Sequence, residues 1–383
     1  MTTAELTVRP HVLVSAAISL DGRLDDASPH RLLLSDPTDL DRVDEVRAGA
    51  DAILVGAGTV RADDPHLLVR SAVRRRARVA AGRPPSPLRV VLTGSGALDP
   101  RANVFRTGTD LGDTLVLTFA GAAGALHGAF GPSVEVTSPG EELTPHAVLG
   151  DLAGRGVVRL MVEGGGTTLT SFFAADLVDE VQLVVAPFFV GDHDAPPFVR
   201  SGRFPQGPDS PMTLVEARPL GDHVLVRYRA GAVDRRWLAE ACALAERCPP
   251  SASAFSVGAV VVSREGEVIA TAYSRRDLPA DHAEEAALRS LRHDPRVAGA
   301  TLYSSLEPCS NRASSPISCA QHILDAGIAR VVTAWREPPT FTRGDGVARL
   351  RAAGVDVVEL PELGELARRP NHHLPIGAGR LPA

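Results

Sequence analysis

Short apolar runs alternate with helical patterns through the first part of the chain. The runs with the spacing of β-strands are residues 11–17, 52–55, 89–92, 114–118 and 159–162. Helical patterns at residues 39–48 and 147–154 lie between some of these runs. Strands that alternate with helices are typical of a mostly parallel sheet covered by helices on both faces. The stretch 74–87, rich in Pro and Arg, is interpreted as an exposed connection with solvated charges.

The end of this first part has a different pattern. Three strand-like runs follow one another closely, with no helical pattern between the last two: residues 182–185, 212–216 and 223–228. This spacing predicts antiparallel strands that complete the sheet. After Arg229 comes a short Ala- and Gly-containing segment, and a new helical pattern follows at residues 237–247. We therefore expect two domains, residues 1–231 and 232–383.

The second part predicts a small α/β sandwich. Its strand-like runs are residues 258–263, 268–272, 301–305, 330–333 and 355–358. Its helical patterns are residues 236–247, 283–292, 320–326 and 346–353. Such a mixture of strands and helices can bury one core of its own.

Composition narrows the class of protein. The 383 residues are 44% hydrophobic and 22% charged, which favours soluble globular domains over disorder. The net charge of −6, without a basic stretch, argues against a nucleic-acid partner. We find no secretion signal and no apolar run near the roughly 20 residues that span a bilayer, so we expect a cytoplasmic protein without membrane contact. Four cysteines in a reducing compartment favour metal ligands or buried thiols.

Two segments of the second part carry side chains that bind metals. His282-Ala283-Glu284 begins a predicted helix, and Glu307-Pro308-Cys309 is followed by Cys319 at the start of another. His-x-Glu followed by Pro-Cys and a second Cys is the signature of zinc-dependent deaminases. One imidazole and two thiolates leave the fourth position on tetrahedral zinc to a water molecule, whose pKa the metal lowers towards neutrality. We therefore expect His282, Cys309 and Cys319 to bind Zn²⁺.

Glu284 is the predicted catalytic residue of this motif. A carboxylate that is not a metal ligand can take the water proton and return it to the departing amine. Glu285 is the alternative candidate for the catalytic role. The motif places the catalytic carboxylate two residues after the histidine, so Glu285 is interpreted as a helix-surface residue. Cys242 and Cys248 have no histidine at ligand spacing and are interpreted as core or surface thiols.

The gap between the two motif cysteines makes the motif more specific. Nine residues, Ser310 to Ser318, separate Cys309 from Cys319, whereas nucleoside deaminases usually have a much shorter gap. With Ser253-Ala254-Phe255-Ser256-Val257-Gly258 and Ala270 to Arg275, the segment resembles the pyrimidine deaminase of the riboflavin pathway, more in its fungal than its bacterial form. The bacterial form usually has an Asn-Pro pair where this chain has Ala254-Phe255. The resemblance implies a cytidine-deaminase-like α/β/α domain.

Glycine clusters directly after strands mark a second candidate site, in the first part of the chain. They occur in Gly56-Ala57-Gly58-Thr59 and in Glu163-Gly164-Gly165-Gly166. Glycines at this position let backbone N–H groups approach a phosphate, and the N-terminus of the following helix favours negative charge. Each cluster alone is more often a tight strand-to-helix turn.

In combination with Ser19-Leu20-Asp21-Gly22 and the segment Ala50 to Pro65, these clusters resemble the NADPH-dependent reductase of the riboflavin pathway, over most of residues 10–230. The resemblance implies a dihydrofolate-reductase-like three-layer α/β/α domain with a mixed sheet. It implies NADPH contacts at Gly56, Gly58, Thr59, Gly164, Gly165 and Thr167, with Ser95 as a candidate for the extra phosphate. It implies substrate contacts at Arg47, Asp64, Leu67, Arg70 and Glu163, the two arginines being suited to a 5′-phosphate. The bacterial family commonly has Lys at the position of Ser15.

The two resemblances belong to one pathway and predict a bifunctional enzyme. They imply reduction of a ribosylamino to a ribitylamino side chain with NADPH, and hydrolytic deamination of the ring, on a small phosphorylated pyrimidine. Because Ser15 and Ala254 depart from the bacterial pattern, a second hypothesis is that both domains act on a specialised metabolite that contains a modified pyrimidine or deazapurine. A third hypothesis is that one of the two domains is catalytically inactive and acts as a scaffold. Both domain families also lead us to expect a homo-oligomer, most simply a dimer.

Overall fold

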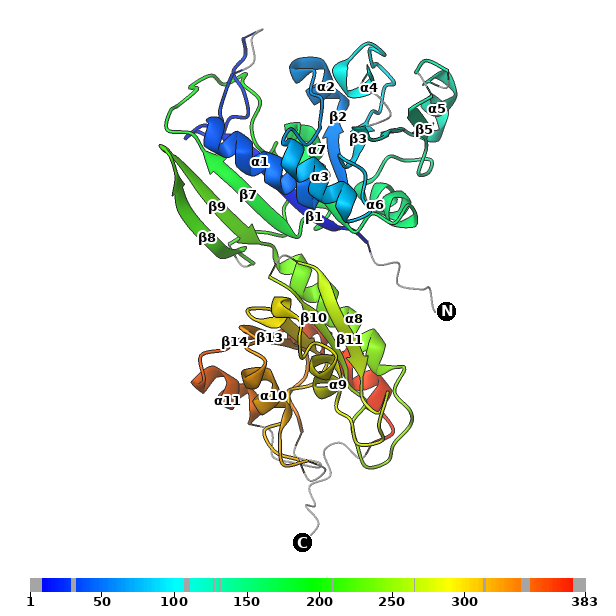
Figure 1. The fold of residues 1–383 in the computed structure, drawn as a ribbon, viewed down its shortest axis with the longest axis vertical. Helices are drawn as coiled ribbons and strands as arrows, with labels where there is room; N and C mark the ends of the chain where they lie inside the picture. Colours follow the sequence, from blue (N-terminus) through cyan, green and yellow to red (C-terminus); the bar gives the residue numbers. More distant parts are fainter. Residues whose placement is uncertain are drawn as a thin grey trace. The chain divides into compact units, whose positions relative to one another are not determined.

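The computed structural model describes residues 9–28, 32–106, 111–126, 128–130, 132–208, 210–264, 266–312, 315–338 and 345–374. The chain divides into two compact units, Met1–Ala232 and Val233–Ala383, and Figure 1 shows the fold of each. In the described part of the chain, no helix is both long and apolar enough to span a membrane.

A sheet of nine strands forms the centre of the first unit, in the order β5-β4-β3-β2-β6-β1-β7-β9-β8. Its strands are β1 (His11–Ile18), β2 (Ala52–Gly56), β3 (Leu88–Leu92), β4 (Thr114–Leu117), β5 (Val134–Thr137), β6 (Arg159–Gly164), β7 (Glu180–Val185), β8 (Thr213–Leu220) and β9 (His223–Arg229). Pairing is parallel from β5 to β7 and antiparallel from β7 through β9 to β8. The predictions of a mostly parallel sheet and of antiparallel strands at its end are confirmed.

Helices cover both faces of this sheet, because successive strand residues point to opposite sides and both sides are apolar. Val12 and Val14 of β1 belong to one core cluster, with residues of α6 and α7, whereas Leu13 belongs to the other, with Val60 of α2. The helices are α1 (Pro37–Gly49), α2 (Ala57–Asp63), α3 (Ala72–Ala80), α4 (Asn103–Arg106), α5 (Ala120–Leu126), α6 (Pro145–Gly154) and α7 (Gly166–Ala174). The three-layer α/β/α prediction is confirmed.

The predicted exposed connection at residues 74–87 is wrong, because helix α3 occupies its first half. Ser71 caps the helix by accepting a hydrogen bond from the Arg74 N–H. Arg78 is 4% exposed and donates hydrogen bonds to the carbonyl oxygens of Ala48 and Ala50, near the end of α1. Arg74 and Arg78, which indicated a solvated loop, therefore hold α3 against α1, and composition alone did not reveal this.

A buried ionic cluster lies at the start of β7. The Glu180 carboxylate accepts hydrogen bonds from Arg227 at 2.8 Å and from Gln182 at 2.9 Å, and His11 lies 3.7 Å away. Burial alone would raise the pKa of Glu180, but His11 and Arg227 outweigh it and lower that pKa from 4.5 to about 2. The native state therefore holds this carboxylate ionised where the unfolded chain would protonate it.

We expect this cluster to make the first unit sensitive to acid. As the pH falls from about 4.5 to about 2, the unfolded state binds a proton at Glu180 before the native state does, so stability on the order of 3 kcal/mol is lost in that window. Hydrogen exchange of the β1 and β7 amides across this range measures the loss. Glu180→Gln should remove the contribution, whereas the exposed Glu142→Gln should not. Equal acid sensitivity in all three proteins would contradict this assignment.

The second unit contains a five-stranded sheet in the order β11-β10-β12-β13-β14, with β10 antiparallel to both of its neighbours and β12, β13 and β14 parallel. The strands are β10 (Gly258–Val262), β11 (Val268–Tyr273), β12 (Thr301–Ser304), β13 (Arg330–Thr333) and β14 (Asp356–Glu359). The helices are α8 (Gly231–Ala245), α9 (Ala283–Arg289), α10 (Cys319–Asp325), α11 (Gly346–Ala352) and α12 (Gly364–Arg368). The predicted helix at residues 236–247 begins earlier, at Gly231, and ends at Ala245.

Candidate active sites

The three predicted zinc ligands meet where α9 and α10 begin. His282 is the residue before α9, Cys319 is the first residue of α10, and Cys309 lies in the loop after β12. The Nδ1 atom of His282 lies 3.3 Å from the Cys319 Sγ and 3.6 Å from the Cys309 Sγ. Among the described residues, this is the one group of three potential ligand atoms that lie within 4.8 Å of one another. The structure therefore brings together side chains that are far apart in the sequence.

Backbone contacts fix the loop that carries Cys309. The buried Glu307 carboxylate accepts hydrogen bonds from the backbone N–H groups of Val347 and Glu337. Gly346, at the start of α11, approaches so closely that a Cβ atom there would collide with the Pro308 carbonyl oxygen. The Glu-Pro-Cys segment is thus held by the N-terminus of α11, which is a reason for a glycine at position 346.

The two ligand thiols, Cys309 and Cys319, have pKa values that are shifted in opposite directions. A hydrogen bond from the Cys319 thiol and the neighbouring His282 lower the pKa of Cys309 to about 4, against burial, while the same pairing and burial raise the pKa of Cys319. Two adjacent thiolates repel each other, and a divalent cation removes that repulsion. The donor set of one imidazole nitrogen and two sulfurs fits Zn²⁺, which prefers N and S ligands.

Glu284 lies beside this ligand set and is 3% exposed. Its Oε1 accepts a hydrogen bond from the Ser304 hydroxyl at 2.8 Å, and its Oε2 lies 3.4 Å from the Cys319 Sγ. Burial raises the pKa of Glu284. Glu285, interpreted as a helix-surface residue, is half-buried: its side chain is 21% exposed and accepts a hydrogen bond from the Arg312 guanidinium at 2.8 Å.

The other two cysteines lie outside the zinc site. Cys242 is 3% exposed in the core of the second unit, where burial raises its pKa to about 12. Cys248 is half-buried, and its thiol donates to the Val257 carbonyl oxygen at 3.4 Å. Both are structural thiols in this fold.

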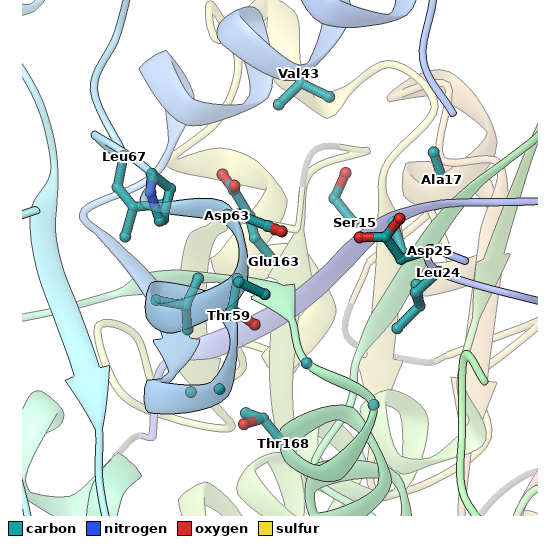
Figure 2. A pocket seen from close by; sticks show the side chains of 18 of the residues that line it. Ser15, Ala17, Leu24, Asp25, Val43, Thr59, Asp63, Leu67, Glu163 and Thr168 are labelled. Carbon is teal, nitrogen blue, oxygen red and sulfur yellow. The ribbon is translucent and has the colours of Figure 1, made fainter. Parts of the chain in front are cut away.

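The second candidate site is a cavity of about 1090 Å³ in the first unit, slightly larger than most ligand sites, which run to roughly 1,000 Å³. Figure 2 shows Ser15 and Asp25 on one side of it and Asp63 and Leu67 on the other. All but one of the residues predicted to contact cofactor or substrate line this cavity: Arg47, Gly56, Gly58, Thr59, Asp64, Leu67, Arg70, Ser95, Glu163, Gly165 and Thr167. The exception, Gly164, ends β6 directly before the lining Gly165.

Two helix N-termini lie side by side in this cavity, because β2 and β6 are parallel neighbours and each leads directly into a helix. The residues before α2 and α7 are Gly56 and Gly165, so no side chain caps either helix. A Cβ atom at Gly56 would lie 2.6 Å from the Thr168 hydroxyl oxygen, and Gly165 has a φ of 74°. Uncapped backbone N–H groups on two adjacent helices fit the diphosphate of a dinucleotide.

The substrate side of the cavity contains a half-buried ion pair. Arg47 donates from Nε and Nη2 to the two carboxylate oxygens of Glu163, both at 2.6 Å, and from Nη1 to the Leu68 carbonyl oxygen. These contacts use the guanidinium that the resemblance assigns to a phosphate. Asp64 and Leu67, in the loop after α2, have φ values of 41° and 52°, a left-handed conformation that is rare outside glycine and often marks functional loops.

Polar residues of α1 line the cavity but were not among the predicted site residues. Asp39, Arg42 and Asp44 are buried and lie on the lining. Arg42 donates to the Asp39 carboxylate at 2.8 Å and to the Gln182 side chain at 2.6 Å. Asp39 and Arg42 are three residues apart and therefore lie on one side of a helix, and a polar pair at this spacing is the signal that could have identified them. Asp44 has no comparable signal in the sequence.

Comparisons with known proteins agree with both sites. Residues 10–226 match the RibD C-terminal domain family, and this match covers more than half of the chain. The chain belongs to this family. Residues 232–335 match the cytidine and deoxycytidylate deaminase zinc-binding region, which includes His282, Cys309 and Cys319. The RibD family uses NADPH, and the deaminase region binds zinc through residues that correspond to the His-Cys-Cys group of this structure. Both cofactors predicted from the sequence are therefore confirmed.

Individual relatives cover the two parts separately. A 2,5-diamino-6-ribosylamino-4(3H)-pyrimidinone 5′-phosphate reductase of Archaeoglobus fulgidus is 43% identical over 49% of this RibD-family chain and 85% of its own. A diaminohydroxyphosphoribosylamino-pyrimidine deaminase of Schizosaccharomyces pombe is 40% identical over 30% of this chain and 29% of its own. A solved deaminase/reductase of Thermotoga maritima is 25% identical, with a TM-score of 0.48 over 58% of this chain and 57% of its own.

Proposed function

We propose that this chain reduces the ribosylamino side chain of a phosphorylated pyrimidine in its first unit and deaminates the pyrimidine ring in its second. The observation that carries the proposal is the presence of two complete and separate sites, a dinucleotide cavity and a His-Cys-Cys-Glu constellation. The reductase and deaminase relatives of the riboflavin pathway support the substrate class and weigh against a specialised metabolite.

In the proposed deaminase site, three residues bind the metal and Glu284 transfers protons. When bound, zinc acts as a Lewis acid that makes a water molecule acidic near neutral pH. Glu284 takes a proton from that water and passes one to the departing amine nitrogen. Ser304 donates a hydrogen bond to Oε1 of Glu284 and orients the carboxylate, leaving Oε2 on the side of the zinc ligands.

The reductase residues bind and orient the two reactants. NADPH supplies the hydride. Gly56, Gly58, Thr59, Gly165 and Thr167 bind its phosphates through the starts of α2 and α7, with Ser95 nearby for the extra phosphate. Glu163 accepts hydrogen bonds from the substrate, and Arg47 holds the Glu163 carboxylate in place. We assign the substrate phosphate to Arg70, which is exposed at the edge of the cavity.

Arg47→Met should abolish reduction. Without its partner, the Glu163 carboxylate, which is 13% exposed, loses its counter-ion, which should cost roughly 1–3 kcal/mol of folding free energy and displace the substrate. NADPH consumption, followed by absorbance, measures activity, and chemical unfolding measures stability. The double variant Arg47→Met/Glu163→Leu should recover stability without recovering activity, and the exposed Arg101→Met serves as control. Normal reduction by a stable Arg47→Met protein would contradict the role of the pair.

We further propose that reduction precedes deamination, as in the fungal pathway that the deaminase segment resembles. The experiment incubates the protein separately with the ribosylamino and ribitylamino forms of the diaminopyrimidinone phosphate and measures ammonia. Release from the ribitylamino form is the expected result, and release from the ribosylamino form alone would refute this order. A dimer in the cytoplasm stays a prediction, and light scattering of the purified protein tests the dimer.

A further inference from the structure

Two side chains directly after Cys309 carry buried polar atoms without a partner. Ser310 is 5% exposed, and the side chain of Arg312 is also 5% exposed. Within the described part of the chain, the Ser310 Oγ and the Arg312 Nε and Nη1 atoms have no hydrogen-bond partner. Burying such groups unpaired costs free energy, so native proteins rarely leave several of them in one place unless a ligand satisfies them.

Arg312 lies close to the zinc ligands. Its Nη2 donates to the Glu285 carboxylate at 2.8 Å, and Glu285 directly follows Glu284 on α9. The Arg312 guanidinium also interacts electrostatically with His282 and Cys319. The unpaired donors of Arg312 and the hydroxyl of Ser310 therefore belong to the surroundings of the reaction centre.

A second arginine holds this segment from outside. Arg349 of α11 donates from Nη1 to the Ser310 carbonyl oxygen and to the Ser318 hydroxyl, both at 3.2 Å, and from Nη2 to Gln321 at 2.5 Å. Arg349 is exposed and its donors are used by protein groups, whereas the Arg312 side chain is 5% exposed and two of its nitrogen atoms have no acceptor among the described residues. Ser310 and Ser318 are thus held in position before a ligand arrives, which lowers the entropic cost of binding.

We propose that Arg312 and Ser310 bind the ring carbonyl oxygen of the pyrimidine and so determine which rings the deaminase accepts. This inference rests on the proposed deaminase function. Glu285 neutralises the charge of Arg312, so the donors that are left suit a neutral oxygen better than a phosphate dianion. A ring without an oxygen at this position leaves the donors unpaired and binds weakly.

The test measures binding to the inactive Glu284→Gln protein by calorimetry, so turnover does not intervene. The probes are the ribitylamino form of the diaminopyrimidinone phosphate, which the proposed order of reactions makes the substrate of the deaminase, and its dephosphorylated form. Zinc content is checked throughout. Adding Arg312→Met should weaken binding of both probes by roughly ten- to a hundredfold, as expected for a hydrogen bond to a charged group. Ser310→Ala should weaken both by roughly two- to tenfold.

Further variants separate the contact from its side effects. Arg312→Met/Glu285→Gln keeps the charge balanced and should bind as weakly as Arg312→Met. The exposed Arg336→Met, at 65% side-chain exposure, should bind like the parent. Unchanged affinity in the Arg312 and Ser310 variants overturns the proposal, as does a loss seen with the phosphorylated probe alone, which would assign Arg312 to the phosphate. A parent that binds neither probe would instead refute the proposed deaminase function itself.

Discussion

Replacing Glu284 by Gln should abolish ammonia release while zinc content and NADPH-dependent reduction stay normal. The amide keeps the size of the carboxylate and can still contact Ser304, but it cannot take a proton from water or pass it to the amine. General acid–base catalysis contributes roughly 10²–10⁴-fold to a rate, so the loss should be at least of that order.

Metal analysis and two separate assays measure this result on one preparation. Glu267→Gln, a substitution on the surface of the same unit, is the matched control, since its side chain is 47% exposed. A Glu284→Gln protein that deaminates at the parent rate would show that another group moves the proton.

Cys319→Ala should remove zinc as well as deamination. Cys319 is fully buried and lies 3.3 Å from the His282 Nδ1, so its loss leaves two ligands, too few for a tetrahedral site. The second unit should also become easier to unfold, because bound metal no longer favours its native state. Reduction should continue, since the dinucleotide cavity is built from other residues.

Tryptophan fluorescence follows this unfolding selectively. Both tryptophans, Trp237 and Trp335, are buried in the second unit, and Trp335 packs edge-on against Phe255. Cys248→Ala is the thiol control and should keep zinc, because this cysteine contacts the Val257 carbonyl oxygen and no ligand. Full zinc content in Cys319→Ala would contradict the ligand assignment.

Sequence patterns predicted the elements whose burial is regular. Strands such as β2 and β10 are short apolar runs, buried on both faces, and a run of that kind needs no tertiary context to be recognised. The zinc ligands could be predicted equally well, because binding by one imidazole and two thiolates restricts both the residue types and their spacing. Helix α3 was missed since its arginines act through contacts with α1 that sequence does not encode locally.

The polar side chains of the two sites were harder to predict. Arg47 was expected to face a phosphate, but only the structure shows its guanidinium engaged with Glu163 and Leu68. Arg312 gave no sequence signal at all, because burial and missing partners are properties of the folded chain. Which arginines bind substrate and which hold other residues depends on contacts between segments distant in the sequence.

The most direct test of a bifunctional chain is a single incubation with 2,5-diamino-6-ribosylamino-4(3H)-pyrimidinone 5′-phosphate and NADPH, analysed by mass spectrometry. We expect a product that has gained two hydrogens in its side chain and exchanged one ring amine for oxygen, with NADPH consumed and ammonia released in equal amounts. Recovery of the unchanged compound, or a product altered in only one of the two ways by a protein loaded with zinc, would contradict this expectation.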